Sequence, residues 1–239
     1  MSTLKMKNPF KSSTMTREQL LEKAEELFTA LRCVSHEESL WGKGGYEYGR
    51  EIPDEIYKHG LLSKLLRLSG QVTPQVKVLD GKGLGFNYNA SYVGREFAKY
   101  LRARDPEESL VLRVYVKNLS AQPPPGTVLM QLLGSLVWSF VAIVPREFDA
   151  SEDLRRRNFQ TLMSGGPEGF EAGLRILLAL PQLKLGKRKL LCVVDGLDLA
   201  ESRDTMNEVR RLVAVLRDLV AKNGGNILYT LGRSSKIIK

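Results

Sequence analysis

The sequence predicts an α/β protein in three layers: a parallel β-sheet with helices on both faces, preceded by an N-terminal helical section. Two patterns carry this prediction. From residue 72 onwards, short apolar segments alternate with longer amphipathic ones, which is the order of strands and crossover helices in a parallel sheet. In addition, one apolar segment ends in a glycine-rich stretch and a later one ends in aspartates. Such strand ends are where open α/β sheets bind ligands.

The chain divides into three parts. Residues 1–15 read as a flexible arm, residues 16–70 as the helical section, and residues 71–239 as the α/β domain. The motif Thr16-x-x-Gln19 has the form of a capping box, which predicts that the first helix begins at this point. The chain stops soon after its last predicted strand, so we expect the α/β domain to be truncated at its C-terminus.

The elements of the α/β domain follow from its apolar periodicity. Short apolar segments predict strands at residues 76–79, 110–116, 190–194 and 226–230. Amphipathic or apolar segments of helical length predict helices at residues 91–102, 127–144, 151–163, 170–180 and 202–222. The helix at 127–144 is apolar on nearly all sides, but polar residues interrupt it. It therefore predicts a buried helix rather than a membrane span.

The composition is that of an ordinary globular protein, with 43% hydrophobic and 26% charged residues. The two cysteines, Cys33 and Cys192, lie far apart, which argues against a disulfide framework and against a four-ligand zinc site. The N-terminal residues are polar and basic and lack the apolar core of a secretory signal. We therefore expect a cytoplasmic or nuclear protein.

Basic residues exceed acidic ones by 36 to 27, which gives a net charge of +9. Such an excess favours polyanionic partners, nucleic acid among them. The densest basic groups lie at residues 155–157, 184–189 and 210–211. Because charged residues of this kind more often form a solvated face, nucleic acid remains the alternative partner.

The apolar segment at 190–194 runs directly into Asp195-Gly196-Leu197-Asp198. A carboxylate at the C-terminal end of a parallel strand can hold Mg²⁺ against nucleotide phosphates, with a second carboxylate to assist. Gly196 permits a sharp turn. The alternative interpretation is that Asp195 caps the turn while Asp198 is solvated.

This segment resembles the Walker B segment of signal-transduction NTPases of the STAND group, which includes the NACHT domains. A helix and then the strand at 226–230 follow it, and the strand leads into Arg233, as in that family. The resemblance implies a P-loop NTPase fold with ATP and Mg²⁺ as ligands. Asp195 would be the Mg²⁺-organising carboxylate and Asp198 the second acidic position. Arg233 would sense the γ-phosphate, with Thr230 a further polar candidate; otherwise Arg233 is an exposed charge at a strand end.

The phosphate loop departs from the family. A working P-loop needs Gly-x-x-x-x-Gly-Lys-Ser/Thr, but no register of Gly81, Lys82, Gly83 and Gly85 before the helix at Ser91 supplies the lysine. The glycines could still form an anion-binding nest, with Lys82 reaching a phosphate from outside. The alternatives are a plain glycine-rich turn, or a methyltransferase-like loop, which the segment resembles with its glycines one position out of step.

Taken together, these features predict a STAND-like nucleotide-binding or pseudo-NTPase module with weak or absent ATP hydrolysis. We expect it to act as a switch or a protein-interaction scaffold, with a protein partner and no membrane span. The alternative is a non-catalytic basic scaffold subunit of a nucleic-acid-associated assembly. A third hypothesis is a transferase that uses S-adenosylmethionine.

Overall fold

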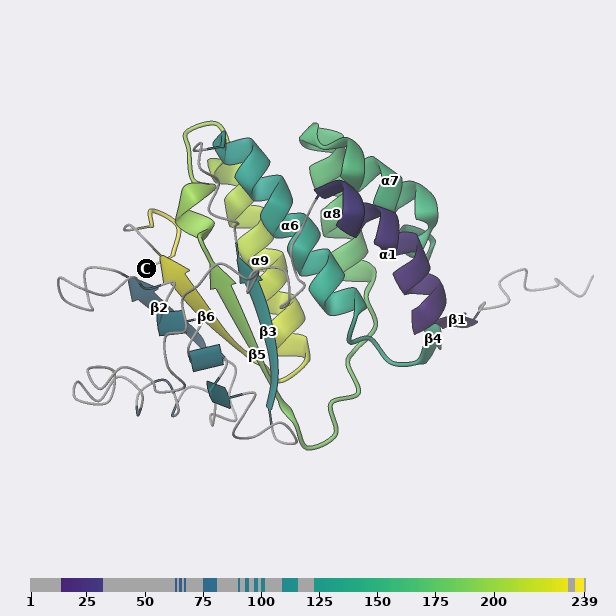
Figure 1. Ribbon diagram of the computed structural model, residues 1–239, viewed down its shortest axis with the longest axis horizontal. Helices are drawn as coiled ribbons and strands as arrows, with labels where there is room; N and C mark the ends of the chain where they lie inside the picture. Colours follow the sequence, from purple (N-terminus) through teal and green to yellow (C-terminus); the bar gives the residue numbers. More distant parts are fainter. Residues whose placement is uncertain are drawn as a thin grey trace, which may run out of the picture.

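The computed structural model describes residues 14–31, 75–80, 109–115, 123–231 and 235–238, together with positions 63, 65, 67, 90, 93, 94, 97, 98, 100 and 101. In this part of the chain, a parallel sheet of four strands occupies the centre (Figure 1). Its spatial order is β2 (Val76–Asp80), β6 (Asn226–Leu231), β5 (Lys189–Asp195) and β3 (Ser109–Tyr115). The predicted α/β class and parallel sheet are thus confirmed.

The strand register aligns the C-terminal ends of all four strands. Thr230 of β6 lies opposite Leu79 of β2 on one side and opposite Asp195 of β5 on the other. Asp195 in turn lies opposite Tyr115 of β3. Because the strands are parallel, this row forms the carboxyl edge of the sheet, at which we look for the site.

Both faces of the sheet are covered. Alternate strand residues point to opposite faces, and they fall into two separate apolar clusters. The larger cluster joins one face to α6 (Pro125–Val141), α8 (Gly166–Ala179) and α9 (Met206–Lys222). The smaller one joins the other face to helical residues between 90 and 101 and to Leu65. Every residue of β5 after Lys189 is buried, as expected for a central strand.

The N-terminal part packs on the same large core. Strand β1 (Thr14–Thr16) pairs antiparallel with β4 (Glu147–Asp149), so Thr14 and Met15, which we assigned to the flexible arm, belong to a strand. Helix α1 (Arg17–Leu31) follows directly and contacts α6 and α7 (Arg156–Ser164) (Figure 1). Its capping box is confirmed: the Thr16 amide donates to Gln19 Oε1 at 3.0 Å, and the Gln19 amide donates to Thr16 Oγ1 at 3.2 Å.

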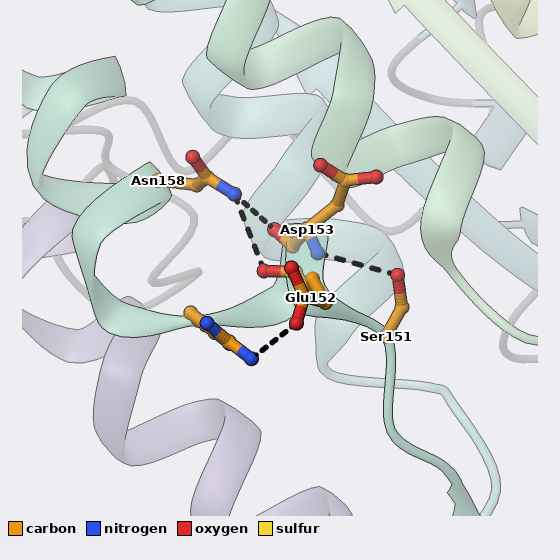
Figure 2. Close-up of polar contacts among 5 residues, drawn as sticks. Ser151, Glu152, Asp153 and Asn158 are labelled. Carbon is orange, nitrogen blue, oxygen red and sulfur yellow. Dashed lines mark hydrogen bonds and ion pairs between the residues drawn. The ribbon is translucent and has the colours of Figure 1, made fainter. Parts of the chain in front are cut away.

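The prediction of a single helix at 151–163 is wrong, because two shorter helical elements form there. A short 3-10 helix, η1 (Glu152–Leu154), is separated from α7 (Arg156–Ser164) by extended backbone at Arg155. Side chains that bond to the backbone explain the break. Ser151 Oγ accepts from the Asp153 amide at 3.2 Å, and Asn158 Nδ2 donates to the Asp153 carbonyl at 3.0 Å (Figure 2).

Helix α9 also begins later than predicted, at Met206 rather than at Ser202. Ser202 and Thr205 bond to each other's backbone, because each amide donates to the other residue's hydroxyl oxygen at 3.0 and 3.2 Å. The Thr205 hydroxyl also donates to the Ala200 carbonyl at 2.6 Å. This closed local arrangement satisfies the backbone outside a helix and delays the helix start.

Helix α6 is the buried helix that its composition predicts. Its buried residues lie on several sides of the helix, and it contacts β3, α1 and α8. In the part of the chain that the structure describes, no helix combines the length and the hydrophobicity needed to span a bilayer.

Candidate functional site at the carboxyl edge of the sheet

Asp195 is the last residue of β5 and is only 9% exposed. The strand before it is apolar and buried, so the carboxylate marks the point at which the chain leaves the core. Alternation along β5 places Asp195 on the same face as Leu191 and Val193, which belong to the smaller apolar cluster. Asp195 therefore faces the side of the sheet that the helical residues between 90 and 101 cover.

Thr230 of β6 holds the Asp195 carboxylate in place. Its hydroxyl donates to Asp195 Oδ1 at 2.8 Å, and the threonine is fully buried. A charge-assisted bond of this kind is stronger than one between neutral groups. Thr230 is the weaker sensor candidate that the sequence suggested; its hydroxyl bonds directly to the predicted Mg²⁺ carboxylate.

The methyl group of Thr230 contacts the neighbouring helix. A Cβ added to Gly94, which is helical and buried, would lie 2.4 Å from Thr230 Cγ2. No real Cβ tolerates this distance, so the helix reaches the strand only because residue 94 is glycine. A glycine that allows such close helix–strand packing also occurs in dinucleotide-binding folds.

The chain turns sharply after Asp195. Gly196 adopts left-handed dihedral angles, with φ of 80° and ψ of 20°, as its predicted role requires. Its amide donates to the Thr230 carbonyl at 3.1 Å, which extends the contact between β5 and β6 by one residue. The 3-10 helix η2 (Leu197–Leu199) follows, and Asp198 within it is 1% exposed. The alternative in which Asp198 is solvated is therefore wrong.

The segments that follow β5 and β6 are joined to each other. The Ser235 hydroxyl donates to Glu201 Oε1, and the Lys236 amide donates to Glu201 Oε2 at 2.9 Å. Ser235 Oγ also accepts from the amides of Ile237 and Ile238 at 3.0 and 2.9 Å. Since Glu201 comes shortly after η2, the segment that follows β5 and the segment that follows β6 are hydrogen-bonded to each other at the carboxyl edge.

The structure brings some of the predicted site residues together and leaves others undescribed. Asp195 and Thr230 are in direct contact, and Asp198 lies buried in the following turn. The remaining predicted residues lie outside the described part of the chain: Gly81, Lys82, Gly83, Gly85, Ser91 and Arg233.

The acidic edge is compatible with a magnesium nucleotide. Among the described residues, no group of three or more His, Cys, Asp or Glu side chains gathers as a metal cluster. Magnesium bound together with phosphates needs only one or two carboxylates, and a carboxylate that accepts a hydrogen bond can still bind a cation through another lone pair. Asp195 thus has the chemistry to hold Mg²⁺ directly or through water, whereas the sequence offers no P-loop lysine.

The basic groups are partly neutralised. Arg155 pairs with Glu152, Arg156 pairs with Glu26, and Arg211 pairs with Glu171. The hydrogen bond from Arg211 lowers the pKa of Glu171, and the same guanidinium lies 5.6 Å from the centre of the Phe170 ring. These contacts are those of a solvated, salt-bridged surface and weaken the nucleic-acid interpretation of two of the three clusters.

A hollow of about 600 Å³ lies away from the acidic edge, beside η1, α7 and α8. Figure 2 shows part of its wall, at Glu152, Asp153 and Asn158. Its lining mixes charges of both signs, among them Glu152, Asp153 and Glu171 with Arg155, Arg157 and Arg175. Because this lining holds no nucleophile–base pair, and its four carboxylates are nearly balanced by three guanidinium groups, we place the candidate site at the sheet edge.

Sequence reasoning missed two residues of this region, Gly94 and Glu201. A lone glycine inside a predicted helix often has a packing reason, so Gly94 carried a signal that could have been used. Glu201 carried no such signal, because its partners Ser235 and Lys236 come from a distant segment.

A scan against models of known protein families gives no match, and neither does a search of curated proteins.

Proposed function

We propose that this chain is a STAND-like nucleotide-binding or pseudo-NTPase module of P-loop type, which acts as a switch or interaction scaffold with weak or absent ATP hydrolysis. One observation carries the proposal: Thr230 donates to Asp195 at 2.8 Å, from a strand that lies between β2 and β5. The contact joins β6, the strand that we propose as the sensor, to the acidic strand end, and β6 also pairs with the strand that leads into the glycine-rich segment.

The strand order supports the P-loop interpretation. A strand that senses phosphates must reach both the glycine-rich segment after β2 and a cation at the end of β5. Only a strand between these two can do so, and β6 occupies this position although it is the last strand in the described sequence. The Walker B resemblance likewise made 226–230 the sensor strand.

The same order speaks against a methyltransferase-like or dinucleotide-binding site. In the doubly wound dinucleotide fold, the first and second strands are neighbours, and their ends grip one ligand. Here β6 and β5 separate β2 from β3. The ends of β2 and β3, which follow each other along the described part of the chain, are therefore separated by two strands, which does not suit that mode of binding.

The chemistry expected of the site is binding rather than rapid turnover. A magnesium ion, when bound, would neutralise phosphate charge, and Asp195 is the residue that would hold it. The lysine that stabilises the charge of a transferring phosphoryl group is missing from the glycine-rich segment. Because Glu201 fixes the exits of β5 and β6 to each other, a ligand at this edge would act on both segments.

Calorimetric titration of the full chain with ATP, with and without Mg²⁺, tests the proposal. We expect ATP to bind and Mg²⁺ to strengthen the binding, and we expect Asp195→Asn to abolish the strengthening. Asp218→Asn, which removes one exposed carboxylate from α9, is the matched control and should behave as wild type. Absence of ATP binding at millimolar concentration would refute a nucleotide site, and tight binding with steady turnover would refute the pseudo-NTPase assignment.

A further inference from the structure

Thr230 touches two parts of the proposed site at once. Its hydroxyl donates to Asp195 Oδ1 at 2.8 Å, and its methyl carbon stands where a Cβ on Gly94 would approach to 2.4 Å. Both contacts are made by one short, fully buried side chain. The two groups that it joins belong to β5 and to the helix that follows the glycine-rich segment.

We propose that Thr230 is a positioning residue that couples the Asp195 carboxylate to the helix behind the glycine-rich segment, so that Gly94, Thr230 and Asp195 move as one unit. The inference rests on the proposed function and extends it, because it states how phosphate binding at one strand end is linked to cation binding at another. In this role Thr230 acts on the cation through Asp195.

The side chain is suited to this role. A β-branched residue is stiff about χ1, so the direction of the hydroxyl is fixed together with that of the methyl group. When the helix presses on the methyl group, the hydroxyl can turn away from Asp195 only by a change of rotamer inside a packed core. Serine would keep the hydrogen bond without the steric contact, and valine would keep the contact without the hydrogen bond.

These two contacts can be separated by substitution. Thr230→Val removes the donor to Asp195 and keeps the shape. Thr230→Ser keeps the donor and vacates the space that a Cβ on residue 94 requires. Gly94→Ala introduces the clash, and the double variant Gly94→Ala/Thr230→Ser removes it again. Circular dichroism and urea unfolding of each full-length variant show whether it folds.

The first experiment tests the link between Thr230 and the cation. It measures the ATP affinity of each variant with and without Mg²⁺ by calorimetry. Loss of an outer-shell partner typically lowers metal affinity by about 10- to 100-fold, so Thr230→Val should lose about tenfold of the Mg²⁺ enhancement of ATP binding. Thr230→Ser should retain the enhancement. If Thr230→Val keeps the full Mg²⁺ enhancement, Thr230 does not position Asp195.

The second experiment tests the packing contact between residues 94 and 230. It compares the urea unfolding midpoints of the variants and does not depend on nucleotide. Gly94→Ala should lower the midpoint in the threonine background and much less in the serine background. Equal effects in both backgrounds would show that residues 94 and 230 are not in contact and would overturn the coupling. If wild type binds no ATP at all, the proposed function fails. The urea midpoints still show whether the Gly94–Thr230 contact exists.

Discussion

Replacement of Tyr229 by phenylalanine should stabilise this protein. Tyr229 is a β6 residue that is fully buried in the large core. Its hydroxyl has no hydrogen-bond partner among the residues that the structure describes. Burial raises the pKa of this phenol above its ordinary value, with a smaller effect in the same direction from Cys192, so the hydroxyl stays neutral at physiological pH.

The expected magnitude follows from the desolvation of one hydroxyl. A buried polar group without a partner costs about 1–3 kcal/mol, and removal of the group recovers part of this cost. We expect Tyr229→Phe to raise the free energy of unfolding by about 1 kcal/mol, because the ring and its packing are kept. For a domain of this size, such a gain corresponds to an increase in Tm of about 2–4 °C.

Urea unfolding followed by circular dichroism and a thermal scan measure the effect. Tyr229→Leu is the control: it also lacks the hydroxyl but leaves unfilled volume in the core, so it should destabilise by about 1–3 kcal/mol. A lower free energy of unfolding for Tyr229→Phe than for wild type would refute the reasoning, since the hydroxyl would then have a stabilising partner.

Two further predictions concern the helices and the central strand. Gly173→Ala in α8 should destabilise by about 1–3 kcal/mol in urea unfolding, because its Cβ would lie 2.5 Å from Leu133 Cδ2. Gly126→Ala, in open space on α6, should not destabilise, and equal effects would contradict the packing argument. Burial raises the pKa of the Cys192 thiol from 9.0 to about 12. The stability that this neutral thiol contributes is complete below about pH 9 and is lost as pH rises towards 12, so Cys192→Ala should lose stability with pH less steeply than wild type, by at most about 1.4 kcal/mol per pH unit.

Much of the fold is predictable because its signals are local. A central strand must be apolar on both faces, so the segment at 190–194 reads as buried without knowledge of its neighbours. The capping box at Thr16 and Gln19 is likewise formed within four residues. The left-handed turn at Gly196 follows from the one residue type that adopts it without strain.

The missed elements depend on distant partners or on competing local bonds. Strands β1 and β4 contain three residues each and form by pairing across more than 130 residues of sequence, with Met15 and Phe148 buried in the large core. The break at Arg155 arises because Ser151 and Asn158 bond to backbone groups that a continuous helix would use differently. Apolar periodicity does not register such bonds.

The candidate site was predictable in position and only partly in its contacts. Asp195 follows from its place at the end of an apolar strand. Thr230 was assigned a weak sensor role, but its bond to Asp195 depends on the spatial order of the strands, and periodicity does not determine that order. Gly94 matters for the same reason, since its closeness to Thr230 exists only after β6 is in place.

The strand order also determines which strand pairings connect the parts of the candidate site. Among the described residues, β2 pairs with β6 and with no other strand. The start of this pairing is held by Gln75, whose amide donates to Asn226 Oδ1 at 2.8 Å and whose carbonyl accepts from the Ile227 amide at 2.9 Å. Among the described strands, the one before the glycine-rich segment therefore pairs with β6 and not with the acidic strand itself. Contacts of such long sequence separation carry a loop-closure cost that is met before they stabilise the fold. In the proposed site, Asp195 and the strand before the glycine-rich segment therefore belong to one continuous sheet because 226–231 lies between their strands, so the site depends on β6 being in place.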